Sequence, residues 1–213
     1  MSKPIRLTKQ MVAEAANGLA DRDSVLAGVL EQFGPPPLLR RPASFATLIH
    51  IILEQQVSVE AARGTFDRLV AACDEAITEP KIEALGEPGL RSLGFSRQKA
   101  RYAVALAADC MSGVFKIAGL SKLDDDAVRA QIVARLGLGD WSADVFMMMA
   151  LLRPDILPVG DLALVKGLEE LDVRAYPDRN DILIRAEDWR PFRSVATRMI
   201  WQSYVRRRGR DVV

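Results

Sequence analysis

The stretch "LGLGDWSADVFMMM", from Leu136 to Met149, sets a short connection, "GLGD", between two amphipathic segments. Gly137 and Gly139 allow the backbone to turn sharply and to approach a neighbouring surface without a Cβ in the way. The segment after the turn begins with backbone amides that have no partner inside their own helix, and such a helix start attracts an anion such as a phosphate. Taken alone, the turn is more typical of an ordinary helix–helix corner with glycine caps.

The composition excludes several classes of protein. The chain has 213 residues, 49% of them hydrophobic, and a formal net charge of +1, so any contact with nucleic acid must come from local basic patches. The only histidine, His50, lies in an apolar run typical of a core, which excludes metal sites that need several histidines. The two cysteines, Cys73 and Cys110, cannot form a four-cysteine zinc or iron–sulfur site, and they indicate a reducing compartment. We expect no cofactor and no metal held by side chains.

The length of the chain limits the number of domains, and the hydropathy pattern indicates in which compartment the protein is found. It is long enough for one large domain or two small lobes with a core. The N-terminal segment "MSKPIRLTKQ" lacks the apolar core of a signal peptide, and no apolar run approaches the length of a bilayer span. We therefore expect a soluble cytoplasmic protein with no membrane partner.

Helical periodicity dominates the chain, and no strand-like alternation persists. We predict an all-α fold of about ten short helices, in which Ser44, Ser58 and Ser96 are N-caps. Because proline blocks the propagation of a helix, "GPPPLLRRP" is predicted to be an extended connector. The expected helices cover, approximately, residues 8–20, 24–33, 45–56, 59–73, 80–85, 88–93, 97–113, 127–136, 141–152, 161–171, 179–187 and 191–208.

The hairpin stretch and a downstream stretch together resemble a known family. "LGLGDWSADVF", followed by "LPVGDLALVKGL", resembles the helix-hairpin-helix motif and the following catalytic aspartate of DNA glycosylases, and the distance from Gly139 to Asp161 lies within the range of that family. Three more stretches resemble the 3-methyladenine DNA glycosylase II branch, namely "ILEQQVSVEAA" (52–62), "LGFSRQKARYAVALA" (93–107) and "WRPFRSVATRMIW" (189–201). They occur in the family's order, and the resemblance covers roughly Phe45 to Tyr204.

The resemblance implies a monofunctional DNA glycosylase that flips out an alkylated purine, such as 3-methyladenine or 7-methylguanine, and excises it hydrolytically to leave an abasic site. It assigns catalysis to Asp161, whose carboxylate would stabilise the oxocarbenium-like sugar or position the attacking water. Asp161 could also serve only as an N-cap, and the alternative function is a non-catalytic helix-hairpin-helix DNA-binding protein. Asp155 and Asp140, the nearest other carboxylates, are interpreted as loop and helix-start residues.

The resemblance places Trp141 and Trp201 in the substrate pocket, where aromatic faces stack on a base and attract a cationic, alkylated one. Leu162 and Val145 stand where some relatives have tyrosine, so we expect a less aromatic pocket and leave the lesion spectrum open. Trp141 also occupies the position of the lysine nucleophile in the bifunctional glycosylase/lyases. Since that position carries no amine, we expect no lyase activity.

The resemblance also assigns contacts with DNA. In "EQQVS", Gln56 matches the wedge that fills the gap left by a flipped base, and Gln55 is its neighbour. For Gln55, binding buried backbone at a helix end is an equally good interpretation. The hairpin residues expected to contact DNA are Gly137, Leu138, Gly139 and Ser142.

Two further features accompany these contacts. The family suggests a monovalent cation held by the backbone carbonyls of the hairpin, which are those of Leu136, Leu138 and Gly139. Local positive charge comes from the start of the helix that holds Arg97, Lys99 and Arg101, among others. If the lobes close around DNA, some of these cations should make binding dependent on salt.

A two-lobed organisation follows from the same resemblance. The whole chain, 1–213, is one glycosylase unit in which residues 42–120 approximate the first helical lobe. Residues 1–41 and 121–213 approximate the second lobe, which carries the hairpin (127–152) and the catalytic aspartate. The segment before Phe45 is too short for the N-terminal β domain of longer relatives, so none is expected. The expected partner is double-stranded DNA that contains alkylated bases, and the expected state is a monomer.

Overall fold

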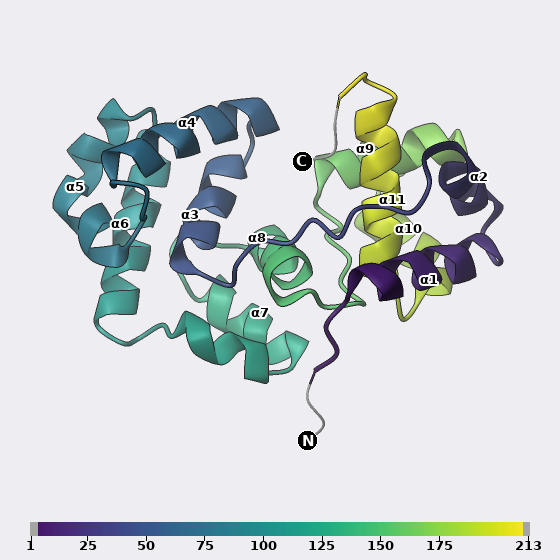
Figure 1. Ribbon diagram of the computed structural model, residues 1–213, viewed down its shortest axis with the longest axis horizontal. Helices are drawn as coiled ribbons and strands as arrows, with labels where there is room; N and C mark the ends of the chain where they lie inside the picture. The colour runs from purple at the N-terminus through teal and green to yellow at the C-terminus, as the bar shows by residue number, and fades with distance from the viewer. Residues whose placement is uncertain (1–3, 211–213) are drawn as a thin grey trace. The chain divides into compact units, whose positions relative to one another are not determined.

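Every regular element in residues 4–210, the part of the chain that the computed structural model describes, is a helix (Figure 1). Eleven α-helices, two 3-10 helices and one π-helical segment follow one another in these residues, which confirms the all-α prediction. The chain divides into two units: a central unit, Arg41–Phe146, and a terminal unit made of residues 4–40 and 147–210. No helix in the described part is long and apolar enough to cross a membrane.

The terminal unit is built around α11 (Arg193–Arg206), in which nine of the 14 residues are buried. A helix that is buried almost all round belongs to the middle of a core. It packs against α9 (Leu162–Asp172), α2 (Ser24–Phe33) and α1 (Lys9–Ala20). The remaining elements of this unit are η2 (Met147–Leu151), α10 (Arg179–Arg185) and η3 (Glu187–Trp189).

A buried arginine ties three segments of the terminal unit together. The Arg198 guanidinium donates to the backbone carbonyls of Leu38 at 3.1 Å, Ser194 at 2.8 Å and Met148 at 2.6 Å. Burial lowers the pKa of Arg198 to about 10. Since a buried charge is tolerated only when it is hydrogen-bonded, these three bonds account for an arginine inside the core. They also hold the extended connector after α2 and the π-helical segment against α11.

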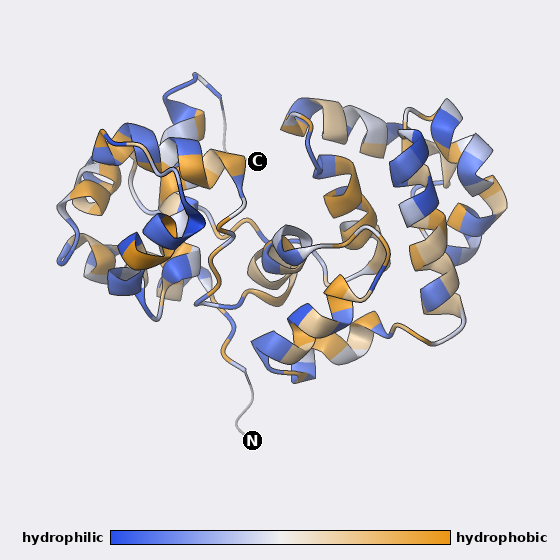
Figure 2. Ribbon diagram, turned by 180° about the vertical axis from the view of Figure 1, so that it is seen from behind, coloured by the Kyte–Doolittle hydropathy of each residue, from blue (hydrophilic) through white to orange (hydrophobic). Residues whose placement is uncertain are grey.

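The central unit is built around α3 (Phe45–Glu54), whose buried face is almost entirely aliphatic or aromatic. It packs against α4 (Val59–Ala72), α6 (Arg97–Met111) and α8 (Asp140–Phe146). Hydrophobic and hydrophilic residues share the helices of both units, as amphipathic helices require (Figure 2). The other elements of the central unit are α5 (Glu79–Ser92), η1 (Ile117–Lys122) and α7 (Asp125–Val133).

The start signals in the sequence are confirmed. The side chains of Ser44, Ser58 and Ser96 each accept a hydrogen bond from the backbone amide three residues further on. The two short helices expected at 80–85 and 88–93 form α5, which is kinked at Gly86, where φ is 58°. His50 was expected in the core. Its ring is half-buried and stacks on Phe66, with 4.2 Å between the ring centroids.

Two predicted boundaries differ from the structure. The first lobe was expected to end near residue 120, but the central unit extends to Phe146, so the hairpin belongs to it and not to the unit that carries Asp161. The reason is packing, because the buried face of α8 lies against α3 and α7. The helix expected at 141–152 ends at Phe146 and continues as the π-helical segment η2, after which Leu152 adopts a positive φ of 59°.

Candidate active site and nucleic-acid interface

Asp161 lies in the terminal unit at the start of α9. Its Oδ1 accepts a hydrogen bond from the Leu164 amide at 2.8 Å, so the residue is the N-cap of α9. The same oxygen accepts a second hydrogen bond from the indole Nε1 of Trp201 at 2.8 Å. A helix cap does not need this second donor. Asp161 is therefore held by two N–H groups, one from each of two helices, while remaining half-buried.

A close approach of α9 to α11 makes the Asp161–Trp201 hydrogen bond possible. A Cβ built on Gly167 would lie 2.7 Å from Cγ2 of Ile200 and 3.3 Å from the Ile200 carbonyl oxygen. Only glycine fits without displacing one of the two helices. This role of Gly167 was not predicted from the sequence. The motif "LALVKG" contained it, but a glycine inside a helical pattern does not reveal which helix lies opposite.

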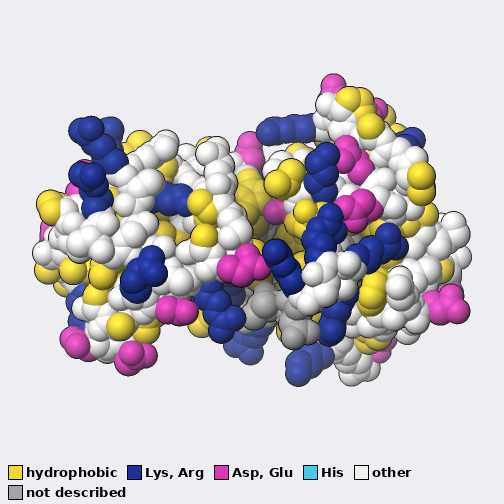
Figure 3. Space-filling view, turned by 90° about the horizontal axis from the view of Figure 1, so that it is seen from above, with side chains coloured by type: hydrophobic (Ala, Val, Ile, Leu, Met, Phe, Trp, Pro, Cys, Tyr) yellow, Lys and Arg dark blue, Asp and Glu magenta, His cyan; other side chains and the backbone are white. Residues whose placement is uncertain are grey.

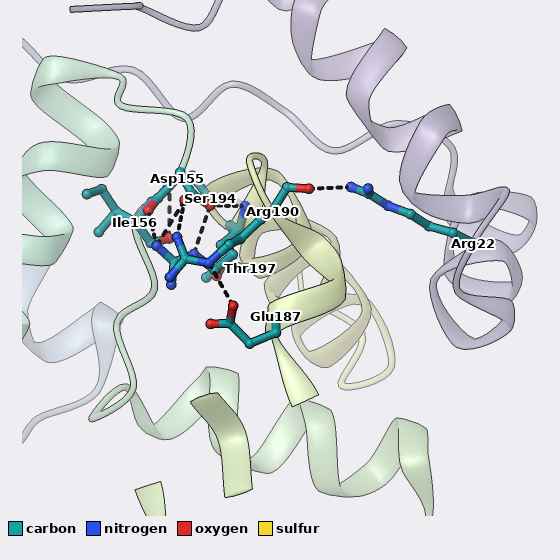
Figure 4. A network of polar contacts seen from close by, with 8 residues as sticks. Arg22, Asp155, Ile156, Glu187, Arg190, Ser194 and Thr197 are labelled. Carbon is teal, nitrogen blue, oxygen red and sulfur yellow. Dashed lines mark hydrogen bonds and ion pairs between the residues drawn. The ribbon is translucent and has the colours of Figure 1, made fainter. Parts of the chain in front are cut away.

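Asp155 has a different environment, although it precedes Asp161 by only one short loop. Two arginines bind its carboxylate: Oδ2 accepts from Arg190 at 2.8 Å (Figure 4), and Oδ1 accepts from Arg193 at 2.8 Å. Arg193 also bonds the Asp155 backbone carbonyl. Both carboxylate oxygens are therefore paired with guanidinium groups that fix the loop to the start of α11. Asp155 is a structural loop residue, as expected.

The other residues assigned to the substrate pocket are divided between the two units. In the terminal unit, Leu162 follows Asp161 and is 69% exposed, and Trp201 is half-buried. In the central unit, Trp141 lies in the first turn of α8 and is half-buried. Val145 was expected to line the pocket, but it is only 3% exposed. It is a core residue, because it lies on the face of α8 that packs inward.

The hairpin consists of α7, a turn through residues 134–139, and α8. Gly137 adopts a φ of +80°, and a Cβ on it would lie 2.1 Å from the ring of Tyr102, so both the conformation and the packing require glycine there. Gly139 has a different environment, because a Cβ on it would meet nothing within 4 Å. Its carbonyl accepts the first helical hydrogen bond, from the Ala143 amide. Gly139 is exposed at the start of α8.

Two hairpin side chains point inward instead of outward. Leu138 is 3% exposed and Ser142 is 2% exposed. The Ser142 hydroxyl lies 3.2 Å from Nε2 of Gln55, which donates to it. Burial removes the Ser142 hydroxyl from the surface, so a contact of Ser142 with DNA stays a prediction for its backbone only. Any contact made by Leu138 must come from its backbone.

The two glutamines after α3 differ. Gln55 donates from Nε2 to the carbonyl oxygen of Gly137 at 2.8 Å, in addition to its bond to Ser142. This confirms the interpretation of Gln55 as a partner of buried backbone. Gln56 is exposed and has a φ of +56°, and its side chain forms no hydrogen bond within the part of the chain that the structure describes. The positive φ turns the chain sharply before the exposed Val57.

Acidic, histidine and cysteine side chains are the groups that could hold a metal ion. In residues 4–210, no cluster of three or more His, Cys, Asp or Glu side chains is arranged to hold a metal ion. A monovalent cation at the hairpin carbonyls stays a prediction.

Asp140, the first residue of α8, lies 3.4 Å from Arg129. On the face shown in Figure 3, Lys and Arg side chains stand among acidic and uncharged ones, so positive charge is local, as the composition indicated.

The fold and the hairpin define the class of protein. The chain matches the HhH-GPD superfamily base excision DNA repair protein family over residues 49–191, a region that includes the second half of α3, the hairpin and Asp161. The chain belongs to this family, which confirms the resemblance inferred from its motifs.

Individual relatives agree with this assignment. A Mycobacterium tuberculosis protein provisionally named as the bifunctional transcriptional activator/DNA repair enzyme AlkA is 32% identical over 209 residues, which cover 86% of this chain and 40% of that protein. Bacillus subtilis YfjP, provisionally named as a DNA-3-methyladenine glycosylase, is 25% identical over 188 residues, which cover 84% and 65%. The chain thus spans less than two thirds of the length of these two relatives.

A solved structure supports the fold. The Schizosaccharomyces pombe 3-methyladenine DNA glycosylase Mag1, in complex with abasic DNA, superposes with a TM-score of 0.77 at 22% identity. The match covers 89% of this chain and 95% of Mag1. The helical architecture of the chain is therefore that of a known glycosylase fold.

Proposed function

We propose that this protein is a monofunctional DNA glycosylase that removes alkylated bases from double-stranded DNA and leaves an abasic site. The observation that carries the proposal is the setting of Asp161, a carboxylate oriented by the Leu164 amide and the Trp201 indole within a chain of the HhH-GPD family. The names of the relatives favour 3-methyladenine and related alkylated purines as substrates.

The proposed chemistry is hydrolysis of the N-glycosidic bond. The bond between C1′ and the base nitrogen breaks, its electron pair leaves with the base, and positive charge develops on the sugar. The Asp161 carboxylate stabilises that charge. Water then adds to C1′, and its proton passes to the carboxylate or to solvent. The Leu164 amide and the Trp201 indole, which orient Asp161, are uncharged donors, so these two partners do not cancel the charge that this step requires.

The remaining tasks fall to residues of both units. The exposed Gln56 side chain fills the gap that the flipped nucleotide leaves in the stack. The first amides of α8, at the open surface beside Gly139, receive a backbone phosphate. Trp201 and Trp141 are the aromatic groups proposed to contact the flipped base, and Leu162 extends the surface beside Asp161. Because Trp141 stands at the lyase position, no Schiff base forms.

The protein is proposed to act as a monomer in the cytoplasm. Cys73 and Cys110 are both free thiols, which is typical of a reducing compartment.

Base release from methylated duplex DNA tests the function. Wild-type protein and Asp161→Asn are incubated with duplexes that carry single defined lesions, and each freed base is identified by mass. We expect release by the wild type, release that is slower by about a hundredfold or more by the variant, and binding of an abasic-analogue duplex by both. No strand should be trapped by borohydride. Equal release by both proteins would exclude Asp161 as the catalytic group, and binding without release by the wild type would favour a non-catalytic DNA-binding protein.

A further inference from the structure

Lys99 has a different environment from the other cations at the start of α6. Its Nζ donates to the backbone carbonyl of Leu53 at 2.7 Å, and the side chain is partly buried. Burial lowers the pKa of this ammonium group. Arg97 and Arg101, on the same helix, are exposed. Lys99 is therefore directed at the protein's own backbone, whereas the sequence placed it in a local patch of positive charge for DNA.

The carbonyl that Lys99 binds belongs to the last turn of α3, three residues before Gln56. The last carbonyls of a helix have no intrahelical donor, and a cation is favourable at that end of the helix dipole. Three consecutive residues are held here by three different partners. Leu53 is held by Lys99, the Glu54 carboxylate by both Nη atoms of Arg41 at 2.8 and 2.6 Å, and Gln55 by the hairpin.

The same side of α6 also supports the hairpin. Tyr102 lies three residues after Lys99, and side chains at that spacing share a helix face. The Tyr102 ring packs so closely on Gly137 that no Cβ fits between them. One face of α6 therefore contacts both the end of α3 and the turn of the hairpin. Lys99 and Tyr102 therefore connect the end of α3 and the turn of the hairpin to the same helix.

We propose that Lys99 is a positioning residue that holds the end of α3, and with it Gln56, in place for insertion into the base stack. The inference rests on the proposed function, in which Gln56 is the wedge. A wedge opens the stack only if the segment behind it does not yield. Without the ammonium group, the last turn of α3 loses the donor on Leu53 and the positive φ at Gln56 has less support.

The test separates a positioning role from a phosphate contact. Lys99→Met is compared with Arg97→Met and Arg101→Met on a duplex that carries an abasic analogue next to 2-aminopurine, whose fluorescence rises when it unstacks. For Lys99→Met we expect the equilibrium for unstacking at saturating protein to fall about tenfold, which corresponds to about 1.4 kcal/mol. The salt dependence of binding should stay as in the wild type. A lost phosphate contact would instead lower the salt slope by about one and leave the fluorescence at saturation unchanged.

A double-mutant cycle with Gln56→Ala shows whether Lys99 acts through the wedge. If it does, Lys99→Met changes the unstacking equilibrium by less than about threefold in the Gln56→Ala background, because coupled residues are not additive. Lys99→Arg, which keeps a cation and N–H donors, should recover most of the wild-type signal. If Lys99→Met melts below the assay temperature, Lys99→Gln, which keeps a shorter donor, takes its place in the cycle.

Failure of the inference about Lys99 can be distinguished from failure of the proposed function. Additive effects of Lys99→Met and Gln56→Ala, wild-type fluorescence in Lys99→Met, or a salt slope lowered by one would each overturn the inference alone. Unstacking does not require base release, so a wild-type protein that unstacks DNA without excising a base still tests Lys99. A wild-type protein that neither binds nor unstacks the duplex overturns both the inference and the proposed function.

Discussion

The loop that leads into α9 and the turn of the hairpin each contain two residues of one type with different environments. In the loop, Asp155 is paired with two arginines, whereas Asp161 accepts hydrogen bonds from Leu164 and Trp201. In the turn, Gly137 is packed under Tyr102 at positive φ, whereas Gly139 borders open space. Asp155 is thus tied to charged groups and Gly137 to a packed ring, whereas the Leu164 and Trp201 donors to Asp161 are uncharged and a Cβ on Gly139 would meet nothing within 4 Å. This difference separates structural from proposed functional residues of identical type.

The largest expected effect comes from replacing each of the two aspartates, in separate variants, by asparagine. Asp161→Asn should lower the single-turnover rate of base release by about a hundredfold or more, because it removes the charge that stabilises the sugar cation. Asn is a good N-cap, so stability should fall by less than about 1 kcal/mol. Asp155→Asn should show the opposite pattern, with a loss of about 1–3 kcal/mol of stability from hydrogen bonds to charged groups and an unchanged rate for the folded fraction.

Chemical denaturation and single-turnover kinetics on both variants check this expectation. If Asp155→Asn abolishes base release in protein that remains folded, the contrast between the two carboxylates is wrong.

The second comparison separates the two glycines of the hairpin. Gly137→Ala should lower the free energy of unfolding by about 2 kcal/mol or more, because alanine is strained at positive φ and its Cβ overlaps the Tyr102 ring. Gly139→Ala should change the free energy of unfolding by less than about 0.5 kcal/mol. It should still weaken binding to any duplex, because the methyl group of the alanine would keep a DNA phosphate further from the first amides of α8. Thermal melts and binding titrations measure the two effects. A Gly139→Ala protein that binds DNA as the wild type does would remove Gly139 from the interface.

The smallest expected effect concerns the indole that orients Asp161. Trp201→Phe keeps an aromatic face but removes the Nε1 donor, so the rate of base release should fall about tenfold, the loss of one hydrogen bond to a charged group. The affinity for an abasic-analogue duplex should change little. Trp201→Ala, which also removes the ring, serves as the comparison. If Trp201→Phe releases the base at the wild-type rate and only Trp201→Ala is slower, Trp201 contributes only through its ring, and its hydrogen bond to Asp161 does not matter.

Much of the local structure was predictable because its causes are local. Ser44, Ser58 and Ser96 cap helices through amides only three residues away, and proline ends helices without help from the rest of the chain. The position of Asp161 at a helix start and the turn at Gly137 were predictable for the same reason. The helical fold and the family followed from the order of such motifs.

The partners of the site residues were not predictable in the same way. The bonds from Trp201 to Asp161, from Lys99 to Leu53 and from Gln55 to Gly137 join residues 40 or more positions apart. No periodicity reports such distances. The burial of the Val145 and Ser142 side chains was not predicted because a short helix with apolar residues on most sides does not reveal which side faces the core. The hairpin was assigned to the other lobe for the same reason.

The sequence by itself determined where several helices begin, that the fold is all-α, and that Asp161 follows a glycine hairpin, since hydrogen bonds and dihedral limits within a few residues decide these features. Only the tertiary structure decided that Asp161 receives an indole N–H while Asp155 receives two guanidinium groups. It alone showed that Lys99 binds backbone and that Gly167 lets α9 approach α11. These features depend on which helix faces lie against each other, and that choice is made by burying apolar area over the whole unit.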